Sequence, residues 1–257
     1  MRYDKQNRKL EALRSEVEKL QAENARLSSE ALAIKEILDA TLHEVRRLSA
    51  QASKFAERLS RDTKNTHVSQ TALSVFYTVN MMSSRLAYTD IELNPRALEN
   101  QTPVRSGIYK KFDKASRILA DEARERGVTI KLEGDSWAEI DALPVFELLP
   151  FVLLDNSIKY TPPNQAVTVA FEISSGRQVV TVKSIGPSVT AEELPKLFEK
   201  GFRAATTAAM PGQGLGLFLA KQVCEFHDIR ISAEAEQHRL FALNGVGYSQ
   251  FRVVLSF

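Results

Sequence analysis

Residues 10–59 read LEALRSEVEKLQAENARLSSEALAIKEILDATLHEVRRLSAQASKFAERL, and this stretch decides the fold of the N-terminal half. Its seam positions recur at alternating steps of three and four residues, which is one uninterrupted heptad register. They are Leu10, Leu13, Val17, Leu20, Asn24, Leu27, Ala31, Ile34, Leu38, Thr41, Val45, Leu48, Ala52, Phe55 and Leu59. A helix of about 80 Å, at about 1.5 Å per residue, needs a partner helix along this seam. Asn24 falls at an a position, where a buried amide favours a two-stranded, in-register pair. The stretch therefore predicts a dimeric coiled coil, with a solvated single helix as the alternative.

A second helix is expected after the polar stretch SRDTKNTH, residues 60–67. The same apolar spacing returns at Val68, Ala72, Val75, Val79, Met82 and Leu86. Two helices joined by a short polar loop predict an antiparallel hairpin. Two such hairpins from two chains predict a four-helix bundle in a homodimer.

Glycine and proline separate the two halves of the chain. The first proline is Pro95 and the first glycine is Gly107, so the first 94 residues contain neither helix breaker. From about residue 104, shorter segments alternate. Helices are expected over 115–127, 142–160, 192–198 and 214–226, and strands over 128–134, 166–173, 177–184, 229–235 and 249–257. The predicted fold class is α+β: a coiled coil and helical hairpin followed by an α/β sandwich.

Composition narrows the class of protein. The chain has 257 residues, enough for about two domains. A net charge of +2 gives no bias toward nucleic acid or anionic membrane. The single cysteine, Cys224, excludes an internal disulfide, and no apolar run reaches the length of a membrane span. We therefore expect a cytoplasmic protein with no nucleic acid partner and no membrane insertion.

Two groups of residues point to phosphate chemistry. Gly212, Gly214 and Gly216 precede and open a helix, where glycine lets the backbone approach an anion closely. Asn156 and Lys159 lie three apart, so they share one face of an apolar helix. An amide oxygen is a suitable Mg²⁺ ligand, and an ammonium group pairs with phosphate. A flexible loop and a surface Asn/Lys pair are the alternatives.

Four motifs then carry a family resemblance. LLDNSIKYTPP (153–163) resembles the N box of histidine kinases, and SIGPS (184–188) stands where their G1 box should be. LFEKGF (197–202) resembles the F box and GQGLGL (212–217) the G2 box. Their order and spacing are similar to the gyrase-type (Bergerat) ATP-binding domain of that family over 104–257. Each motif is weak alone, whereas four in sequence are specific.

The helical hairpin is then similar to the dimerisation and phosphotransfer domain of the same family. That domain carries its phosphoacceptor as a histidine followed by an acidic residue, which HEVRR supplies as His43 and Glu44. His43 falls at an f position and faces away from the seam. The other histidines are His67, His227 and His238. A solvated helix histidine without a function is the alternative for His43.

The resemblance implies three domains: a signalling coiled coil over 1–38, the hairpin over 39–98 and the ATP-binding domain over 104–257. It implies a sensor histidine kinase core that uses ATP and Mg²⁺ to phosphorylate His43. The phosphoryl group would pass to an aspartate in the receiver domain of a response regulator. An upstream sensor protein is a further expected partner.

Site roles also follow from the resemblance. Asn156 would hold Mg²⁺, Lys159 would neutralise phosphate charge and Tyr160 would flank the nucleotide. The other implied nucleotide contacts are Ser184, Gly186, Gly212, Gly214, Leu215 and Gly216. Residues 203–211 would form a mobile lid. Glu44 would orient or deprotonate the ring of His43.

The chain departs from the family pattern at four positions. Ser184 replaces the aspartate that bonds the adenine amino group, and Ser188 replaces the second G1 glycine. Val152 replaces a frequent polar residue of the N box. Arg47 stands where a small polar residue often supports phosphatase activity. These departures predict weaker ATP binding and a poor phosphatase. Two alternatives stay open: a non-enzymatic histidine phosphotransferase with a decayed ATP domain, and a pseudokinase scaffold.

Overall fold

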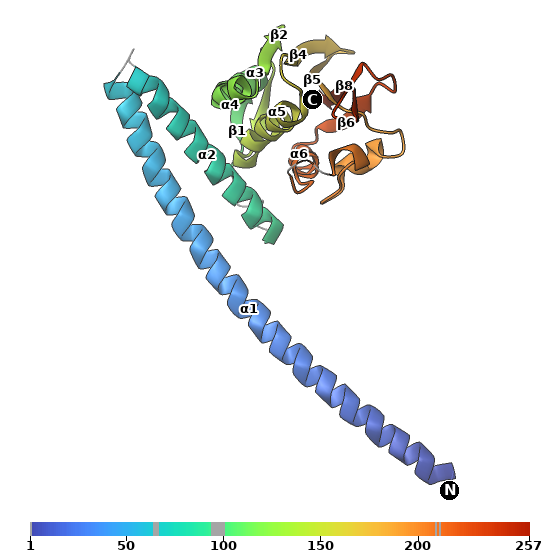
Figure 1. Cartoon of the computed structure of the whole chain (residues 1–257). Helices are drawn as coiled ribbons and strands as arrows, with labels where there is room; N and C mark the ends of the chain where they lie inside the picture. Colours follow the sequence, from blue (N-terminus) through green and yellow to red (C-terminus); the bar gives the residue numbers. More distant parts are fainter. Residues whose placement is uncertain (1, 64–66, 94–100, 209, 211) are drawn as a thin grey trace. The chain divides into compact units, whose positions relative to one another are not determined.

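The N-terminal part of the protein is one long helix. The structure is a computed structural model that describes residues 2–63, 67–93, 101–208, 210 and 212–257. It comprises two compact units, Met1–Leu48 and Ser49–Phe257. Helix α1 (Arg2–Asp62) runs without a break, as the heptad register predicts (Figure 1). The polar stretch 60–67 was expected to be a loop, but α1 continues to Asp62. The ion pair from Arg61 to Glu57, at 2.8 Å and one turn apart, supports this last turn.

The apolar seam of α1 is uncovered within the single chain. Eight of its large seam side chains are 47–66% exposed, whereas Leu38 and Val45 are half-buried; the eight are Leu13, Val17, Leu20, Leu27, Ile34, Leu48, Phe55 and Leu59. A row of this kind on one helix face is the surface that a coiled-coil partner covers.

Helix α2 (His67–Leu93) packs on the end of α1, as predicted for a hairpin. In the second unit, Ser53 Oγ donates to Asn80 Oδ1 at 3.0 Å, and Ala56 and Ala72 are both buried. Residues 64–66, within the predicted connection, lie outside the described residues.

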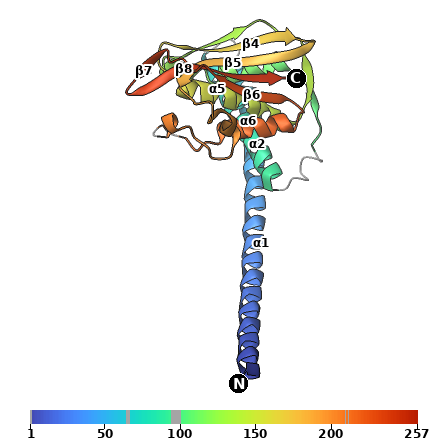
Figure 2. The same cartoon turned by 90° about the vertical axis from the view of Figure 1, so that its right-hand side faces the viewer.

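A mixed sheet forms one layer of the C-terminal part (Figure 2). Its strands follow the order β2-β4-β5-β8-β6, and β7 also pairs with β8. Their bounds are β2 Thr129–Glu133, β4 Ala166–Ser174, β5 Arg177–Pro187, β6 Arg230–Ala235, β7 Phe241–Leu243 and β8 Val246–Ser256. The β2–β4 pair is parallel and the others are antiparallel. The five strands expected from the sequence are all present.

Helices form the second layer, and Figure 2 shows α5 and α6 together on one face of the sheet. The α-helices are α3 Ile108–Ile118, α4 Ala120–Glu125, α5 Leu148–Tyr160 and α6 Gly216–Glu225. In the part of the chain that the structure describes, the short 3-10 helices are η2 Pro144–Glu147, η3 Leu194–Phe198 and η4 Ala205–Thr207. Leu153 and Ile158 of α5 and Val169, Val180 and Leu255 of the sheet are at most 1% exposed, so the core lies between the layers. The predicted α+β class is confirmed.

The structure contains strands that the sequence analysis missed. β1 (Val104–Gly107) and β3 (Glu139–Ala142) form a separate antiparallel pair. β7 joins β8 through Asn244 and Gly245, whose φ angles are +51° and +80°. This two-residue turn with positive φ is a strong hairpin signal that the sequence contains. The helix expected over 115–127 also differs from the observed structure. α3 begins earlier, at Ile108, and the helix is interrupted at Leu119, after which α4 begins.

Candidate active site

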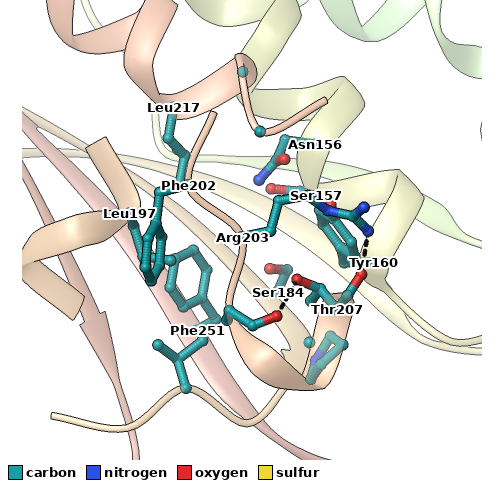
Figure 3. A pocket seen from close by; sticks show the side chains of 16 residues that line it. Asn156, Ser157, Tyr160, Ser184, Leu197, Phe202, Arg203, Thr207, Leu217 and Phe251 are labelled. Atoms are coloured by element: carbon teal, nitrogen blue, oxygen red, sulfur yellow. Dashed lines mark hydrogen bonds between the residues drawn. The ribbon is translucent and has the colours of Figure 1, made fainter. Parts of the chain in front are cut away.

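A pocket of about 660 Å³, its open mouth included, lies between α5, the end of β5 and the chain segment leading into α6. Figure 3 shows Leu197, Phe202 and Phe251 gathered on one side of it and Asn156 and Tyr160 on the other. The apolar side suits a flat ring, and the opposite side carries polar groups. A pocket with an apolar wall and a few convergent polar groups is the usual form of a small-molecule site.

Helix α5 supplies the polar side of the pocket. Asn156 and Tyr160 line it one helical turn apart, as residues on a common face must. Lys159 Nζ lies 4.9 Å from the centre of the Tyr160 ring, within cation–π range. It also lies against the backbone of Gly212, where a Cβ atom would collide with it. Lys159 therefore lies beside the glycine segment, and the roles predicted for Asn156 and Lys159 stay predictions.

The end of β5 forms the buried floor. Ser184 is 8% exposed and lines the pocket with Gly186. A Cβ atom at Gly186 would stand 4.0 Å from Tyr160 Cβ, so a larger side chain would enter the space beside the Tyr160 ring. The floor therefore offers a hydroxyl group where the related motif offers a carboxylate.

The glycine segment approaches the pocket with its backbone. Gly214 has φ +69°, and a Cβ atom there would lie 2.5 Å from the carbonyl oxygen of Phe202. Its own carbonyl accepts the N–H of Gly201 at 3.1 Å. Gly216 begins α6, and a Cβ atom on it would lie 3.6 Å from Asn156 Oδ1. Leu215 is the N-cap residue of α6, and its side chain makes no capping hydrogen bond. The first N–H groups of α6 therefore receive no hydrogen bond from the side chain of Leu215.

The lid segment, residues 203–211, closes another side of the pocket; residues 209 and 211 lie outside the described residues. Arg203, Ala204 and Thr207 line the pocket. The guanidinium group of Arg203 donates to the carbonyl oxygens of Thr207 and Met210. Arg203 is the one charged residue among the described lining residues, and the sequence analysis did not single it out. Its position directly after the F-box stretch was the feature of the sequence from which its place near the pocket could have been predicted.

The histidines lie in distinct settings. His43 is exposed on α1, as its f position predicts, and Glu44 follows it in the same helix. His227 is engaged at both ring nitrogens: Nε2 accepts the N–H of Leu143 at 3.0 Å, and Nδ1 lies 2.7 Å from the carbonyl oxygen of Val223. His238 is exposed between β6 and β7. The His67 side chain lies outside the described residues.

The residues present fit a magnesium ion carried in by a phosphate ligand. Asn156 Oδ1 faces Gly216, which has no side chain of its own to fill the space between them. Among the described residues, no group of three or more His, Cys, Asp or Glu could form an all-protein metal site. Mg²⁺ in phosphoryl-transfer sites often takes one or two protein oxygens, with water and phosphate supplying the rest.

Most of the residues predicted for the site meet at this one pocket. Asn156, Tyr160, Ser184, Gly186, Gly214 and Gly216 line it. Lys159 and Gly212 contact each other beside it, and Leu215 lies between two lining glycines. His43 belongs to the first compact unit and the pocket to the second, and each is described by itself. The roles of these residues stay predictions.

The fold and the pocket define a class of protein. Residues 148–256 match the family described as histidine kinase-, DNA gyrase B- and HSP90-like ATPases. This part of the chain is similar to that family, and the four motifs lie within the matched residues. The predicted resemblance to a sensor histidine kinase core is thereby confirmed.

The similar individual proteins are named as sensor proteins or sensor histidine kinases. The sensor protein BceS of Halalkalibacterium halodurans is 33% identical over 109 residues, which cover 40% of this chain and 32% of that protein. The sensor histidine kinase YkoH of Bacillus subtilis is 34% identical over 87 residues, covering 33% and 19%. The solved structure of the mycobacterial sensor histidine kinase MprB is 22% identical, with a TM-score of 0.47, over 60% of this chain and 97% of that chain. The chain thus spans about a third or less of these two curated relatives.

No helix in the described part of the chain combines the length and the apolar character needed to cross a membrane.

Proposed function

We propose that the chain is the core of a two-component sensor histidine kinase, which uses ATP to phosphorylate His43 and passes the phosphoryl group to an aspartate of a response regulator. The observation that carries the proposal is the single pocket that gathers Asn156, Tyr160, Ser184 and the Gly214–Gly216 backbone. These residues come from α5, β5 and the start of α6, far apart in the sequence. The exposed His43, followed by Glu44, supplies an acceptor.

The pocket geometry supports separate binding sites for the base and for the triphosphate of ATP. The base would lie against Phe202 and Phe251, with Ser184 at its edge. The triphosphate would lie toward Lys159 and the glycine backbone, where an ammonium group and N–H groups neutralise its charge. Mg²⁺, when bound with ATP at Asn156, would offset phosphate charge.

The transfer step is an in-line displacement at the γ-phosphorus atom. A neutral nitrogen of the His43 ring forms the new N–P bond, while the bond from the γ-phosphorus to the bridging oxygen breaks and ADP leaves. Glu44 orients the ring or accepts its proton. In the second step a carboxylate oxygen of the regulator takes the phosphoryl group from His43.

The proposal includes the homodimer and the three domains over 1–38, 39–98 and 104–257. The uncovered apolar seam of α1 supports the dimer, because a second copy would cover it. An upstream sensor protein and a cytoplasmic location belong to the same proposal and rest on the sequence pattern alone.

Radiolabelled ATP tests the proposal directly. Wild-type protein with Mg²⁺ should acquire an acid-labile label. His43→Gln should abolish it, while His238→Gln, which alters another exposed histidine, should label normally. Persistent label in His43→Gln would refute the assignment of the acceptor.

A second candidate is a histidine phosphotransferase without kinase activity, and Ser184 is the observation that favours it. Loss of the carboxylate at the pocket floor is a change expected of a domain that no longer binds adenine. In that case ATP would give no label, whereas a phosphorylated regulator would label His43. A protein that is labelled by neither donor would be a pseudokinase scaffold.

A further inference from the structure

The carboxylate of Glu193 joins two backbone segments that are far apart in the sequence. Glu193 lies at the start of η3, and its Oε1 accepts the N–H of Ala205 at 2.8 Å. Its Oε2 accepts the N–H of Thr190 at 3.1 Å. Both oxygens of one side chain are therefore used, one on the turn after β5 and the other on the lid segment.

Two further contacts hold the same part of the lid segment. Thr206 Oγ1 donates to the carbonyl oxygen of Ser188 at 3.0 Å. Arg203 binds the carbonyl oxygens of Thr207 and Met210 from within the segment. Consecutive residues 205 and 206 are thus bonded to the segment that follows β5, and Arg203 links Thr207 to Met210.

The tied residues include part of the pocket wall. Ala204 and Thr207 line the pocket and are 2% and 9% exposed, respectively. The bonds of Glu193 and Thr206 fall between these two wall residues. These hydrogen bonds therefore determine the position of this wall of the pocket.

The chemistry of Glu193 suits such a tie. A carboxylate has two acceptor oxygens and can take two N–H groups at once, whereas an amide can accept with only one. The N–H of Ala205, followed by that of Thr190, holds the pKa of Glu193 below its ordinary value, so both oxygens accept at neutral pH. The neighbouring Glu192 is exposed and hydrogen-bonds only to its own backbone and to Thr190, which makes it a matched control.

We propose that Glu193 is a positioning residue, which fixes the first half of the lid segment beside the pocket before nucleotide enters. A segment that is already ordered loses less conformational entropy when the ligand binds. Glu193 therefore strengthens nucleotide binding without touching the nucleotide. The inference rests on the proposed function, because it assumes that ATP and ADP occupy this pocket.

The test compares wild type, Glu193→Gln and Glu192→Gln in the 257-residue chain. Amide hydrogen exchange of Ala205 and Thr190 in the nucleotide-free protein reports the tie itself. In Glu193→Gln, at least one of these amides should exchange roughly tenfold faster, since it loses a charge-assisted bond. Calorimetry should show ADP binding weakened by a similar factor, roughly tenfold. The midpoint of thermal unfolding should match that of Glu192→Gln, which a general loss of structure would not allow.

A pH series adds a readout specific to the carboxylate. Protection of the Ala205 amide in wild type should be constant at neutral pH and fall only in acid, as Glu193 becomes protonated. In Glu193→Gln it should lack this step. Equal exchange in wild type and Glu193→Gln would overturn the tie, and unchanged ADP affinity despite faster exchange would overturn the positioning role. If wild type binds no ADP while the exchange difference persists, the proposed function fails and the positioning role with it, whereas the tie stands.

Discussion

The hydroxyl group of Ser184 at the pocket floor replaces the charged acceptor that the family resemblance implies for the adenine amino group. A carboxylate there would accept a charge-assisted hydrogen bond, which is stronger than a neutral one by about 1–2 kcal/mol. Ser184→Asp should therefore tighten ATP binding roughly 5- to 30-fold. Serine both donates and accepts, so wild type should also reject GTP less strongly than the variant does.

Titration calorimetry with ATP and GTP on both proteins measures this difference. The interpretation is wrong if wild type already binds ATP as tightly as Ser184→Asp and discriminates equally against GTP. Absence of binding in both proteins would support the decayed-domain alternative.

Gly214 shows how strictly the backbone of the pocket is constrained. Its φ of +69° would strain any other residue by about 1–2 kcal/mol, and a Cβ atom would meet Phe202 O at 2.5 Å. Gly214→Ala should therefore displace the segment before α6 and weaken ATP binding by at least roughly tenfold. Gly176 has a similar φ, +76°, but open space around its Cβ position. Gly176→Ala should lower stability by a similar strain and leave the ATP affinity unchanged; equal affinities in the two variants would contradict the argument.

At the residue scale, the sequence predicted those site members whose chemistry has a fixed spacing. Asn156 and Lys159 could be placed on one helix face because helical periodicity sets their directions. The contacts of Arg203 could not be predicted in this way. They depend on where the lid segment folds back, and the partners of Arg203 are backbone carbonyl groups. The tie through Glu193 is invisible for the same reason: a backbone N–H leaves no signature in the sequence.

At the element scale, length decided what could be predicted. The long helices and the five main strands carry enough apolar positions for a clear period, and all are present. β1 and β3 have four residues each, too few for alternation to stand out, and they pair only with each other. β7 has three residues, but the Asn244–Gly245 turn beside it was a usable signal. Prediction therefore failed for β1 and β3 because pairing with a distant segment, and not a local pattern, stabilises them.

The end of α6 is joined to the start of η2 by His227, and this junction should respond to pH. Burial, offset in part by the carbonyl of Val223 and by Asp228, lowers the pKa of His227 below its ordinary value. The folded protein then binds fewer protons than the unfolded chain. The stability contribution is fully present above about pH 6.5 and is lost as the pH falls toward the lowered pKa.

Substitution of His227 isolates its contribution to the pH dependence of stability. His227→Gln can still accept the N–H of Leu143 but cannot titrate, so it should lose less stability than wild type between pH 7.5 and about pH 5.5. We expect a difference below about 1 kcal/mol, because solvent screens a partly exposed ring. Urea unfolding at both pH values measures it, with His238→Gln as the control that should behave like wild type. An identical pH dependence in all three proteins would exclude the junction as a pH-sensitive point.

At the scale of the whole molecule, the two kinds of sequence pattern correspond to two kinds of stabilisation. The C-terminal part buries its own core: Phe112, Val145, Phe146, Leu149 and Leu154 are completely or almost completely inaccessible. Helix α1 does the opposite, because eight large side chains of its heptad seam are 47–66% exposed. A row of exposed apolar side chains of this length is unfavourable in water unless a second surface covers it.

The chain should therefore form a parallel dimer through this seam, with Asn24 setting the number of strands. Asn24 is exposed in the single chain, and in a dimer its amide would face the same amide of the second copy. Asn24→Leu should raise the thermal stability of the dimer, by about 1–3 kcal/mol per buried side chain, while allowing trimers or tetramers to appear. Thermal unfolding and multi-angle light scattering measure the two effects. Ser29→Leu, at the exposed f position that faces away from the seam, should change neither strand number nor stability to this extent. A wild-type monomer at micromolar concentration would exclude the dimer, and a strictly dimeric Asn24→Leu would show that Asn24 does not set the strand number.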